Sequence, residues 1–209
     1  MITTLLLIRH GETPWNTLGK IQGIHNIDLS EAGIMQAKQL CNRLQGKFDA
    51  VYCSPLNRAY ETARILCENS KLTPTKIEDL REIDFGSWEG LTFKEVAANY
   101  TEAFNNWKTD DLKGAMYDGD GSIYNVSKRG KNCIESLIKK HPGETIVIVS
   151  HGGFIKASLI GLFNWPMSMY HHFALGNTCM TTIHFNDALS PMLLGLNDTT
   201  HLTRAVPSV

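Results

Sequence analysis

Short apolar segments and longer amphipathic segments alternate along most of this chain. Residues 3–8, 50–54 and 145–150 are apolar runs of the length that buried strands have. The stretches between them repeat their apolar residues at helical spacing. Strands that are connected through helices form a parallel sheet with helices on both faces. We therefore predict an α/β protein, a three-layer α/β/α sandwich around a mostly parallel central sheet.

Three helices are expected from the spacing of their apolar residues. Ser30 is a typical N-cap for the first of them, and residues 57–69 and 125–140 form the other two. The helix after Ser30 would place Ile34, Ala37, Leu40 and Leu44 on one face. The helix at 57–69 would do the same with Ala59, Ala63 and Leu66, and the helix at 125–140 with Val126, Ile134, Leu137 and Ile138.

The second half of the chain adds two strands and an insertion. Residues 179–185 and 192–196 are expected to be strands, because both have a strand-like composition and a polar turn separates them. Residues 93–107 look helical, and the Gly- and Asp-rich residues 110–122 look like a loop. We expect residues 92–122 to form a small insertion over a pocket.

Length and composition restrict the protein class. The 209 residues suit one domain, 1–209, and a net charge of -1 gives no general affinity for nucleic acid or membrane. The five cysteines are scattered and include no C-x-x-C pair, which argues against a disulfide framework or a thiolate metal site. This cysteine pattern favours a reducing, cytoplasmic location, and the apolar run at residues 5–8 is too short for a signal peptide.

Three strand ends carry residues that suit an anion site. Arg9-His10-Gly11 and Ser150-His151-Gly152-Gly153 each follow a predicted strand, and Arg58 follows the third. Ligands bind at the carboxyl ends of parallel strands, and backbone N–H groups at a helix start favour anions. Each segment taken alone is equally consistent with a solvated strand end or a tight turn.

Cys53 and Arg58 suggest a second type of phosphate chemistry. Tyrosine phosphatases place a thiolate and an arginine around a phosphate loop, but their motif has five intervening residues and this chain has four. We therefore interpret Cys53 as a small buried residue.

The acidic segment 80–90 mixes carboxylates with Phe85 and Trp88. A carboxyl beside large apolar side chains tends to have a raised pKa, which suits a proton donor. A solvated acidic loop is the simpler interpretation, and we prefer it for Asp84 and Glu89.

Four blocks together resemble the histidine phosphatase superfamily, also called phosphoglycerate mutase-like. They occur in the family's order, at residues 9–13, 54–63, 80–86 and 150–153, and the resemblance extends from residue 3 to residues 197–202. It implies a phosphomonoester hydrolase that forms a phosphohistidine and needs no cofactor or metal. The implied catalytic residues are His10, Glu82, Arg9, Arg58 and His151, and the implied substrate-binding residues are Asn16, Gln22, Gly23 and Gly152. In this chain Gly121 occupies the position of a glutamate that is common in the family.

The resemblance implies a mechanism for these residues. His10 attacks phosphorus, the cationic side chains of Arg9 and Arg58 together with His151 hold the phosphoryl oxygens, and Glu82 protonates the leaving alkoxide. Glu82 then activates the water that releases inorganic phosphate.

Three other functions compete with a phosphatase. Glycolytic mutases typically carry Arg-His where Ile83-Asp84 follow Glu82, which argues against a 2,3-bisphosphoglycerate-dependent mutase. A non-catalytic phosphate-binding homologue would lack the nucleophile or the acid, and both are present. A metallohydrolase is the weakest alternative, because His171-His172 lacks helical ligand spacing.

The substrate is expected to be a small molecule. Segments 80–92 and 197–202 look most like α-ribazole phosphatases and broad-specificity phosphatases. The insertion supplies a large apolar and aromatic surface, so we expect some of these residues to face the pocket: Phe93, Tyr100, Phe104, Trp107, Met116 and Tyr117. An uncharged heterocyclic leaving group, as in α-ribazole 5′-phosphate, would suit such a pocket better than 3-phosphoglycerate. The oligomeric state is left open.

Overall fold

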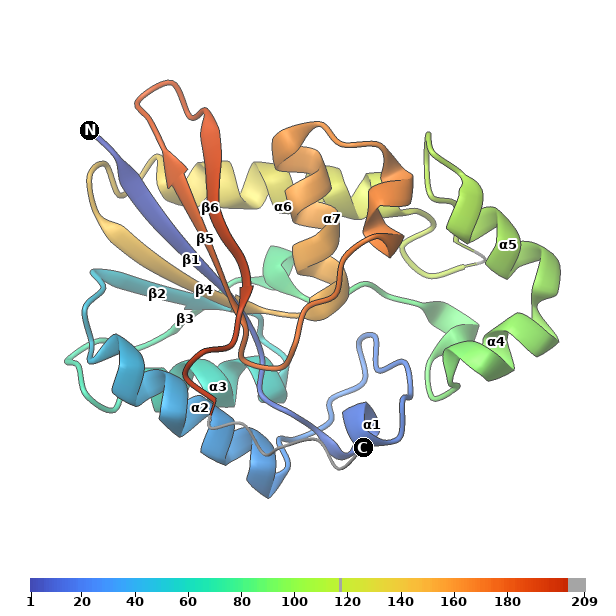
Figure 1. The fold of residues 1–209 in the computed structure, drawn as a ribbon, viewed down its shortest axis with the longest axis horizontal. Helices are drawn as coiled ribbons and strands as arrows, with labels where there is room; N and C mark the ends of the chain where they lie inside the picture. The colour runs from blue at the N-terminus through green and yellow to red at the C-terminus, as the bar shows by residue number, and fades with distance from the viewer. Residues whose placement is uncertain (117, 203–209) are drawn as a thin grey trace.

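A six-stranded sheet forms the centre of the protein in a computed structural model that describes residues 1–116 and 118–202 (Figure 1). The strand order is β3-β2-β4-β1-β5-β6. Strands β3, β2, β4 and β1 run parallel to one another, whereas β5 pairs antiparallel with both of its neighbours, β1 and β6. The strand bounds are β1 (Thr3–Arg9), β2 (Ala50–Cys53), β3 (Thr75–Lys76), β4 (Thr145–Ser150), β5 (Met180–Phe185) and β6 (Pro191–Asp198).

The helices cover both faces of this sheet, which confirms the predicted three-layer α/β/α fold. Helices α2 and α3 pack on one face, and α6 and α7 pack on the other. The helix bounds are α1 (Pro14–Thr17), α2 (Glu31–Leu44), α3 (Asn57–Leu66), α4 (Phe93–Asn99), α5 (Thr101–Thr109), α6 (Ile123–Ile138) and α7 (Gly152–Phe163). Short 3-10 helices lie at Glu78–Leu80, Gly86–Trp88 and Met167–His171.

Local sequence explains where the predicted elements begin. The Ser30 hydroxyl accepts a hydrogen bond from Gly33 N at 3.1 Å and caps α2, as expected. Strand β4 has the predicted bounds, and the other predicted strands differ at their ends by one or two residues. The predicted helix at 57–69 ends earlier, at Leu66.

The insertion contains two helices rather than the single helical stretch predicted at 93–107. The chain leaves helical geometry at Tyr100, whose φ and ψ are -131° and 43°, and α5 begins directly after it. Trp107 packs edge-on against Trp88, with 5.6 Å between ring centroids, and joins the insertion to the main core. The insertion is therefore fixed to the domain by aromatic packing.

Parallel pairing brings the carboxyl ends of three strands to one edge of the sheet. Arg9 at the end of β1 pairs with Ser150 at the end of β4, and Cys53 at the end of β2 pairs with Val149. The residues that follow these strands consequently lie together. None of the helices in the described part of the chain is long and apolar enough to cross a membrane.

Candidate active site

His10 lies buried at the end of β1, with 2% of its surface exposed. Its Nδ1 lies 2.6 Å from the Gly11 carbonyl oxygen, so Nδ1 carries the proton and Nε2 keeps its lone pair. Burial, and then the positive charges of Arg58 and Arg9, hold the pKa of His10 well below its usual value. The imidazole is therefore neutral near pH 7, which is the form that can attack phosphorus.

His151 lies beside His10, with 5.2 Å between the ring centroids. Its Nε2 is 2.7 Å from the Ser54 hydroxyl oxygen, and its Nδ1 has no partner among the described residues. Burial, followed by Arg58 and His10, lowers its pKa well below the usual value. We predict His151 together with the two arginines as part of the phosphoryl site, and the lowered pKa makes it a neutral hydrogen-bonding group there rather than a third cation.

Two arginines supply the positive charge around these histidines. Arg58 is fully buried, and its two terminal nitrogens donate to the carbonyl oxygens of His25 and Gly23 at 2.6 and 2.7 Å. Arg9 donates to the Leu175 carbonyl oxygen at 2.5 Å. The Nε groups of both arginines are buried without a partner among the described residues, so each has a donor available for an anion.

The turn at Gln22 and Gly23, which the family resemblance implies as part of the site, lies in the pocket lining. Gly23 has a φ of 49°, and a Cβ atom there would overlap the Glu89 carboxylate. Glu89 accepts hydrogen bonds from Ile24 N at 3.0 Å and Phe85 N at 3.1 Å. The expectation that Glu89 is a solvated acid is wrong, because its side chain is 6% exposed and joins two loops of the site.

Asn16 and Gly152 also line the pocket. The Asn16 Oδ1 atom accepts hydrogen bonds from Thr13 N at 3.1 Å and from Asn177 Nδ2 at 3.2 Å. These bonds fix the orientation of the Asn16 side-chain amide and use its oxygen rather than its N–H groups. Gly152 is the first residue of α7, where backbone N–H groups favour an anion. A side chain at Gly152 would press on Arg9, because its Cβ would lie 3.3 Å from Arg9 Nε.

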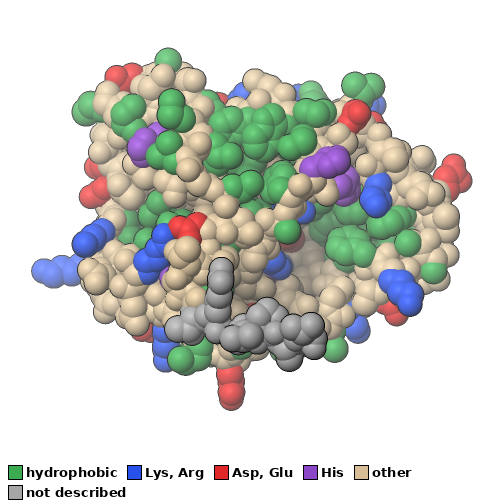
Figure 2. All heavy atoms as spheres, in the orientation of Figure 1, with side chains coloured by type: hydrophobic (Ala, Val, Ile, Leu, Met, Phe, Trp, Pro, Cys, Tyr) green, Lys and Arg blue, Asp and Glu red, His purple; other side chains and the backbone are tan. Residues whose placement is uncertain are grey.

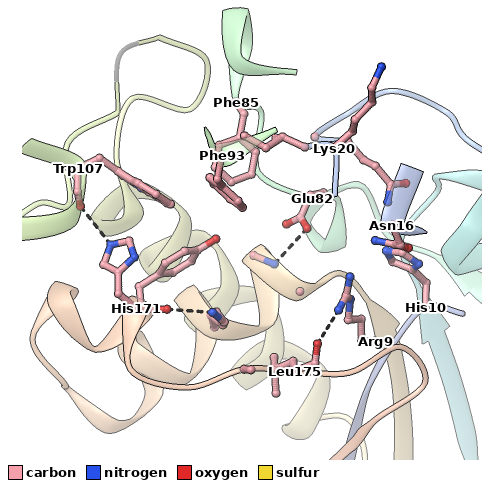
Figure 3. A pocket seen from close by; sticks show the side chains of 18 of the residues that line it. Arg9, His10, Asn16, Lys20, Glu82, Phe85, Phe93, Trp107, His171 and Leu175 are labelled. Atoms are coloured by element: carbon pink, nitrogen blue, oxygen red, sulfur yellow. Dashed lines mark hydrogen bonds between the residues drawn. The ribbon is translucent and has the colours of Figure 1, made fainter. Parts of the chain in front are cut away.

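Glu82 is held in the pocket wall by three backbone N–H groups. Its Oε1 accepts from Ile83 N at 2.9 Å and from Phe154 N at 2.7 Å, whereas its Oε2 accepts from Gly153 N at 3.1 Å. Figure 3 shows Glu82 between the side of the pocket with Arg9 and His10 and the side with Phe93 and Trp107. Its carboxylate is thus fixed at the junction of the two parts of the pocket.

The pocket that these residues line has a volume of about 510 Å³. Figure 2 shows the surface hollowed between the sheet with its helices and the lobe that carries α4 and α5, with Lys or Arg atoms visible inside. Of the insertion residues considered for this role, Phe93, Phe104 and Trp107 line it, Tyr100 and Met116 are not among its lining residues, and Tyr117 lies outside the described residues. Sequence reasoning missed Lys156, Tyr170, His171 and Leu175, which are also in the lining.

The environment of Cys53 does not favour a thiolate. Burial raises the pKa of the Cys53 thiol to about 12, and Cys53 is fully buried, which confirms its interpretation as a small core residue. No group of three His, Cys, Asp or Glu side chains able to hold a metal ion occurs in the described part of the chain.

Gly121 makes no polar side-chain contact, but Asp120 beside it does. The Asp120 carboxylate accepts from Asp84 N at 2.9 Å and pairs with Arg129 at 3.2 Å and Arg81 at 3.4 Å. The insertion loop is therefore joined through Asp120 to the segment that carries Glu82.

Neutral buried histidines between two arginines, at the carboxyl edge of a parallel sheet, define an enzyme class that acts on phosphate esters. Comparison with known proteins agrees with this class. The model of the histidine phosphatase superfamily (branch 1) matches residues 5–199, and the chain belongs to this family. It is a phosphatase of the histidine type.

Several relatives are similar over almost their full lengths. Phosphoserine phosphatase 1 of Hydrogenobacter thermophilus is 36% identical over 95% of this chain and 93% of its own length. The adenosylcobalamin/α-ribazole phosphatase of Escherichia coli is 31% identical over 90% of this chain and 93% of its own. A mutant phosphoserine phosphatase from Entamoeba histolytica, solved in complex with phosphoserine, is 40% identical, covers 96% of this chain and all of its own, and superposes with a TM-score of 0.89.

Proposed function

We propose that this chain hydrolyses a small carboxylate-bearing phosphomonoester of the phosphoserine type through a phosphohistidine on His10. The observation that carries the proposal is a neutral, buried His10 placed between Arg9 and Arg58, with Glu82 in the wall of the same pocket. These residues supply a nucleophile, a fixed cationic environment and a carboxyl group for proton transfer.

In the first step, His10 Nε2 attacks phosphorus and the bond to the leaving oxygen breaks. The Nδ1–H bond to Gly11 fixes the ring orientation during the attack. The free Nε donors of Arg9 and Arg58 stabilise the charge on the equatorial oxygens. Glu82 in its protonated form donates a proton to the leaving alkoxide.

The hydrogen bonds of Glu82 indicate which oxygen carries that proton. Oε1 already accepts two backbone hydrogen bonds, whereas Oε2 accepts only the longer bond from Gly153. Oε2 is therefore the atom that exchanges the proton. After the alcohol has left, the ionised Glu82 takes a proton from a water molecule as this water attacks the phosphohistidine, and inorganic phosphate is released.

The charges in the pocket favour a substrate with a second anionic group. In the part of the lining that described residues form, Lys20, Lys108 and Lys156 join the two arginines, and Glu82 is the one carboxylate. A phosphoryl group needs only the arginines and histidines at one end. The lysines argue for a carboxylate on the leaving group. The phosphoserine phosphatase of E. histolytica, 41% identical to this chain, has also been solved with 3-phosphoglyceric acid, a ligand of this kind.

An α-ribazole 5′-phosphate phosphatase is the second candidate. The stacked rings of Phe93 and Trp107, 5.7 Å apart and inclined by 9°, give the pocket a wall that suits a heterocycle. The similarity to the α-ribazole phosphatase of E. coli supports the same substrate.

Steady-state kinetics with phosphoserine, 3-phosphoglycerate, α-ribazole 5′-phosphate and p-nitrophenyl phosphate separates these candidates. We expect kcat/KM for phosphoserine to exceed that for α-ribazole 5′-phosphate by at least about tenfold, which corresponds to roughly 1.4 kcal/mol of transition-state stabilisation. The opposite order would support the second candidate. Conversion of 3-phosphoglycerate to its isomer when 2,3-bisphosphoglycerate is added would instead favour a mutase.

A further inference from the structure

Lys156 lies on the face of α7 that lines the pocket. It follows Gly152 by four residues, so the two positions share one helix face, and both are in the lining. At 1.5 Å per residue, the Lys156 backbone lies about 6 Å further along the helix than the first N–H groups of α7. Lys156 therefore faces the part of the pocket beyond the phosphoryl end.

The ammonium group of Lys156 has few partners. Its Nζ donates to the Tyr170 carbonyl oxygen at 3.1 Å and lies 5.1 and 5.5 Å from the ring centroids of Tyr170 and Phe173. An ammonium has three N–H donors, so two remain free. Within residues 1–116 and 118–202, no carboxylate oxygen lies within 4.0 Å of this Nζ, whereas Lys131 on α6 pairs with Glu135.

Removing a cation from water without an anionic partner costs free energy. Burial, and then the positive charge of Arg9, lower the pKa of Lys156, and Glu82 only partly offsets them. Lys108 is exposed to solvent, and Lys20 lies partly exposed beside Trp15. Among the lysines of the lining, Lys156 is thus the one whose charge an anionic group of the ligand would stabilise most.

We propose that Lys156 binds the carboxylate of the substrate, while Arg9, Arg58 and the two histidines hold its phosphoryl group. This inference rests on the proposed function, because it requires a substrate with a carboxylate. The apolar rings of Tyr170 and Phe173 beside Nζ lower the local dielectric constant, which strengthens the ion pair. Lys156 thereby selects the leaving group, whereas the phosphoryl site is common to all substrates.

The test compares phosphoserine with phosphoethanolamine, which has the same phosphoryl and amino groups but no carboxylate. The Lys156→Met variant keeps the apolar stem and removes the charge. We expect it to lower kcat/KM for phosphoserine about 10- to 100-fold, mainly through KM, as for the loss of a charge-assisted hydrogen bond. For phosphoethanolamine and p-nitrophenyl phosphate, kcat/KM should change less than about threefold.

Two further variants serve as controls. Lys128→Met removes an exposed lysine of α6 that stands over the Tyr124 ring, outside the pocket lining, and should leave kcat/KM unchanged for all three substrates. Lys156→Arg should restore part of the preference for phosphoserine, because it restores the charge. Thermal melts establish that each variant is folded.

The outcomes separate the two proposals. An equal loss with every substrate would show that Lys156 serves the phosphoryl step or the fold, and an unchanged preference in Lys156→Met would equally overturn the inference. If Lys20→Met or Lys108→Met, rather than Lys156→Met, lowers kcat/KM for phosphoserine alone, the substrate carboxylate binds at that other lysine. If the wild-type protein hydrolyses p-nitrophenyl phosphate but does not prefer phosphoserine over phosphoethanolamine, the proposed function itself fails.

Discussion

Replacing Gly153 by alanine should impair proton transfer without unfolding the protein. Gly153 lies in the first turn of α7, and a Cβ atom there would lie 2.7 Å from Glu82 Oε1 and 2.9 Å from the Tyr170 hydroxyl oxygen. Ordinary contact begins at 3.4 Å, so the Glu82 oxygen must retreat by about 3.4 - 2.7 = 0.7 Å. The helix itself gains, because alanine is favoured over glycine by about 1 kcal/mol.

The clash is with Oε1, which accepts the two shorter bonds from Ile83 N and Phe154 N, and moving Oε1 shifts the whole carboxylate, including Oε2. The hydrogen bond from Gly153 N to Oε2 is 3.1 Å long, and Oε2 is the oxygen assigned to proton exchange. Loss of one hydrogen bond to a charged group costs about 1.5–3 kcal/mol, and an error of about 1 Å in position can cost a factor of about 100 in rate. We expect single-turnover hydrolysis of phosphoserine to fall about 10- to 100-fold.

p-Nitrophenyl phosphate provides the internal comparison, because its leaving group needs little protonation. The burst of p-nitrophenolate, which reports only phosphoryl transfer to His10, should stay within about threefold of the wild-type rate. Gly195→Ala on β6 is the matched control, since nothing lies within 4 Å of a Cβ there. An equal loss of the burst and of phosphoserine turnover, or unchanged turnover of both, would refute the assignment of Glu82.

Three further predictions test the site. Activity should persist in EDTA, because nucleophile, cations and acid are all side chains; loss in EDTA that added Mg²⁺ restores would contradict this. Cys53→Ser should keep activity within about threefold, since burial raises the pKa of the Cys53 thiol to about 12; abolished phosphoryl transfer in a folded variant would argue for a thiolate nucleophile. The pKa values of buried His10 and His151 lie well below that of an unfolded histidine, so the unfolded chain binds more protons below about pH 6.5. The free energy of unfolding should therefore fall as the pH drops below that value, by at most about 1.4 kcal/mol per pH unit for each histidine. Urea titrations at several pH values measure this dependence. No fall in the wild type, or an equally steep dependence on pH in His151→Asn, would count against neutral buried imidazoles.

The site could be predicted from sequence where strand ends fix the position of a side chain. His10 and His151 follow β1 and β4 directly, and Arg58 lies in the first turn of the helix that follows β2, so parallel pairing brings them together. The order of the sheet was not predictable in this way, because it depends on which helix faces pack. The two-residue strand β3 was missed, since it is too short to show a periodic pattern.

The specificity end of the pocket was harder to predict. Lys156 follows Gly152 by one helical turn, and this spacing was a usable signal. Tyr170 and His171 lie in a 3-10 helix whose position against α5 and α7 depends on tertiary packing, which local sequence does not encode. The burial of Glu89 is not predictable from the local sequence for the same reason, because Ile24, which donates a hydrogen bond to it, lies in a loop distant in sequence.

Trapping of the covalent intermediate tests the nucleophile directly. The protein is mixed with radiolabelled p-nitrophenyl phosphate, quenched in alkali within the first turnover and digested. The account predicts an acid-labile, alkali-stable label on the peptide that contains His10, and no label in His10→Ala. A label that is stable in acid, or one that lies on a serine, on Cys53 or on His151, would contradict it.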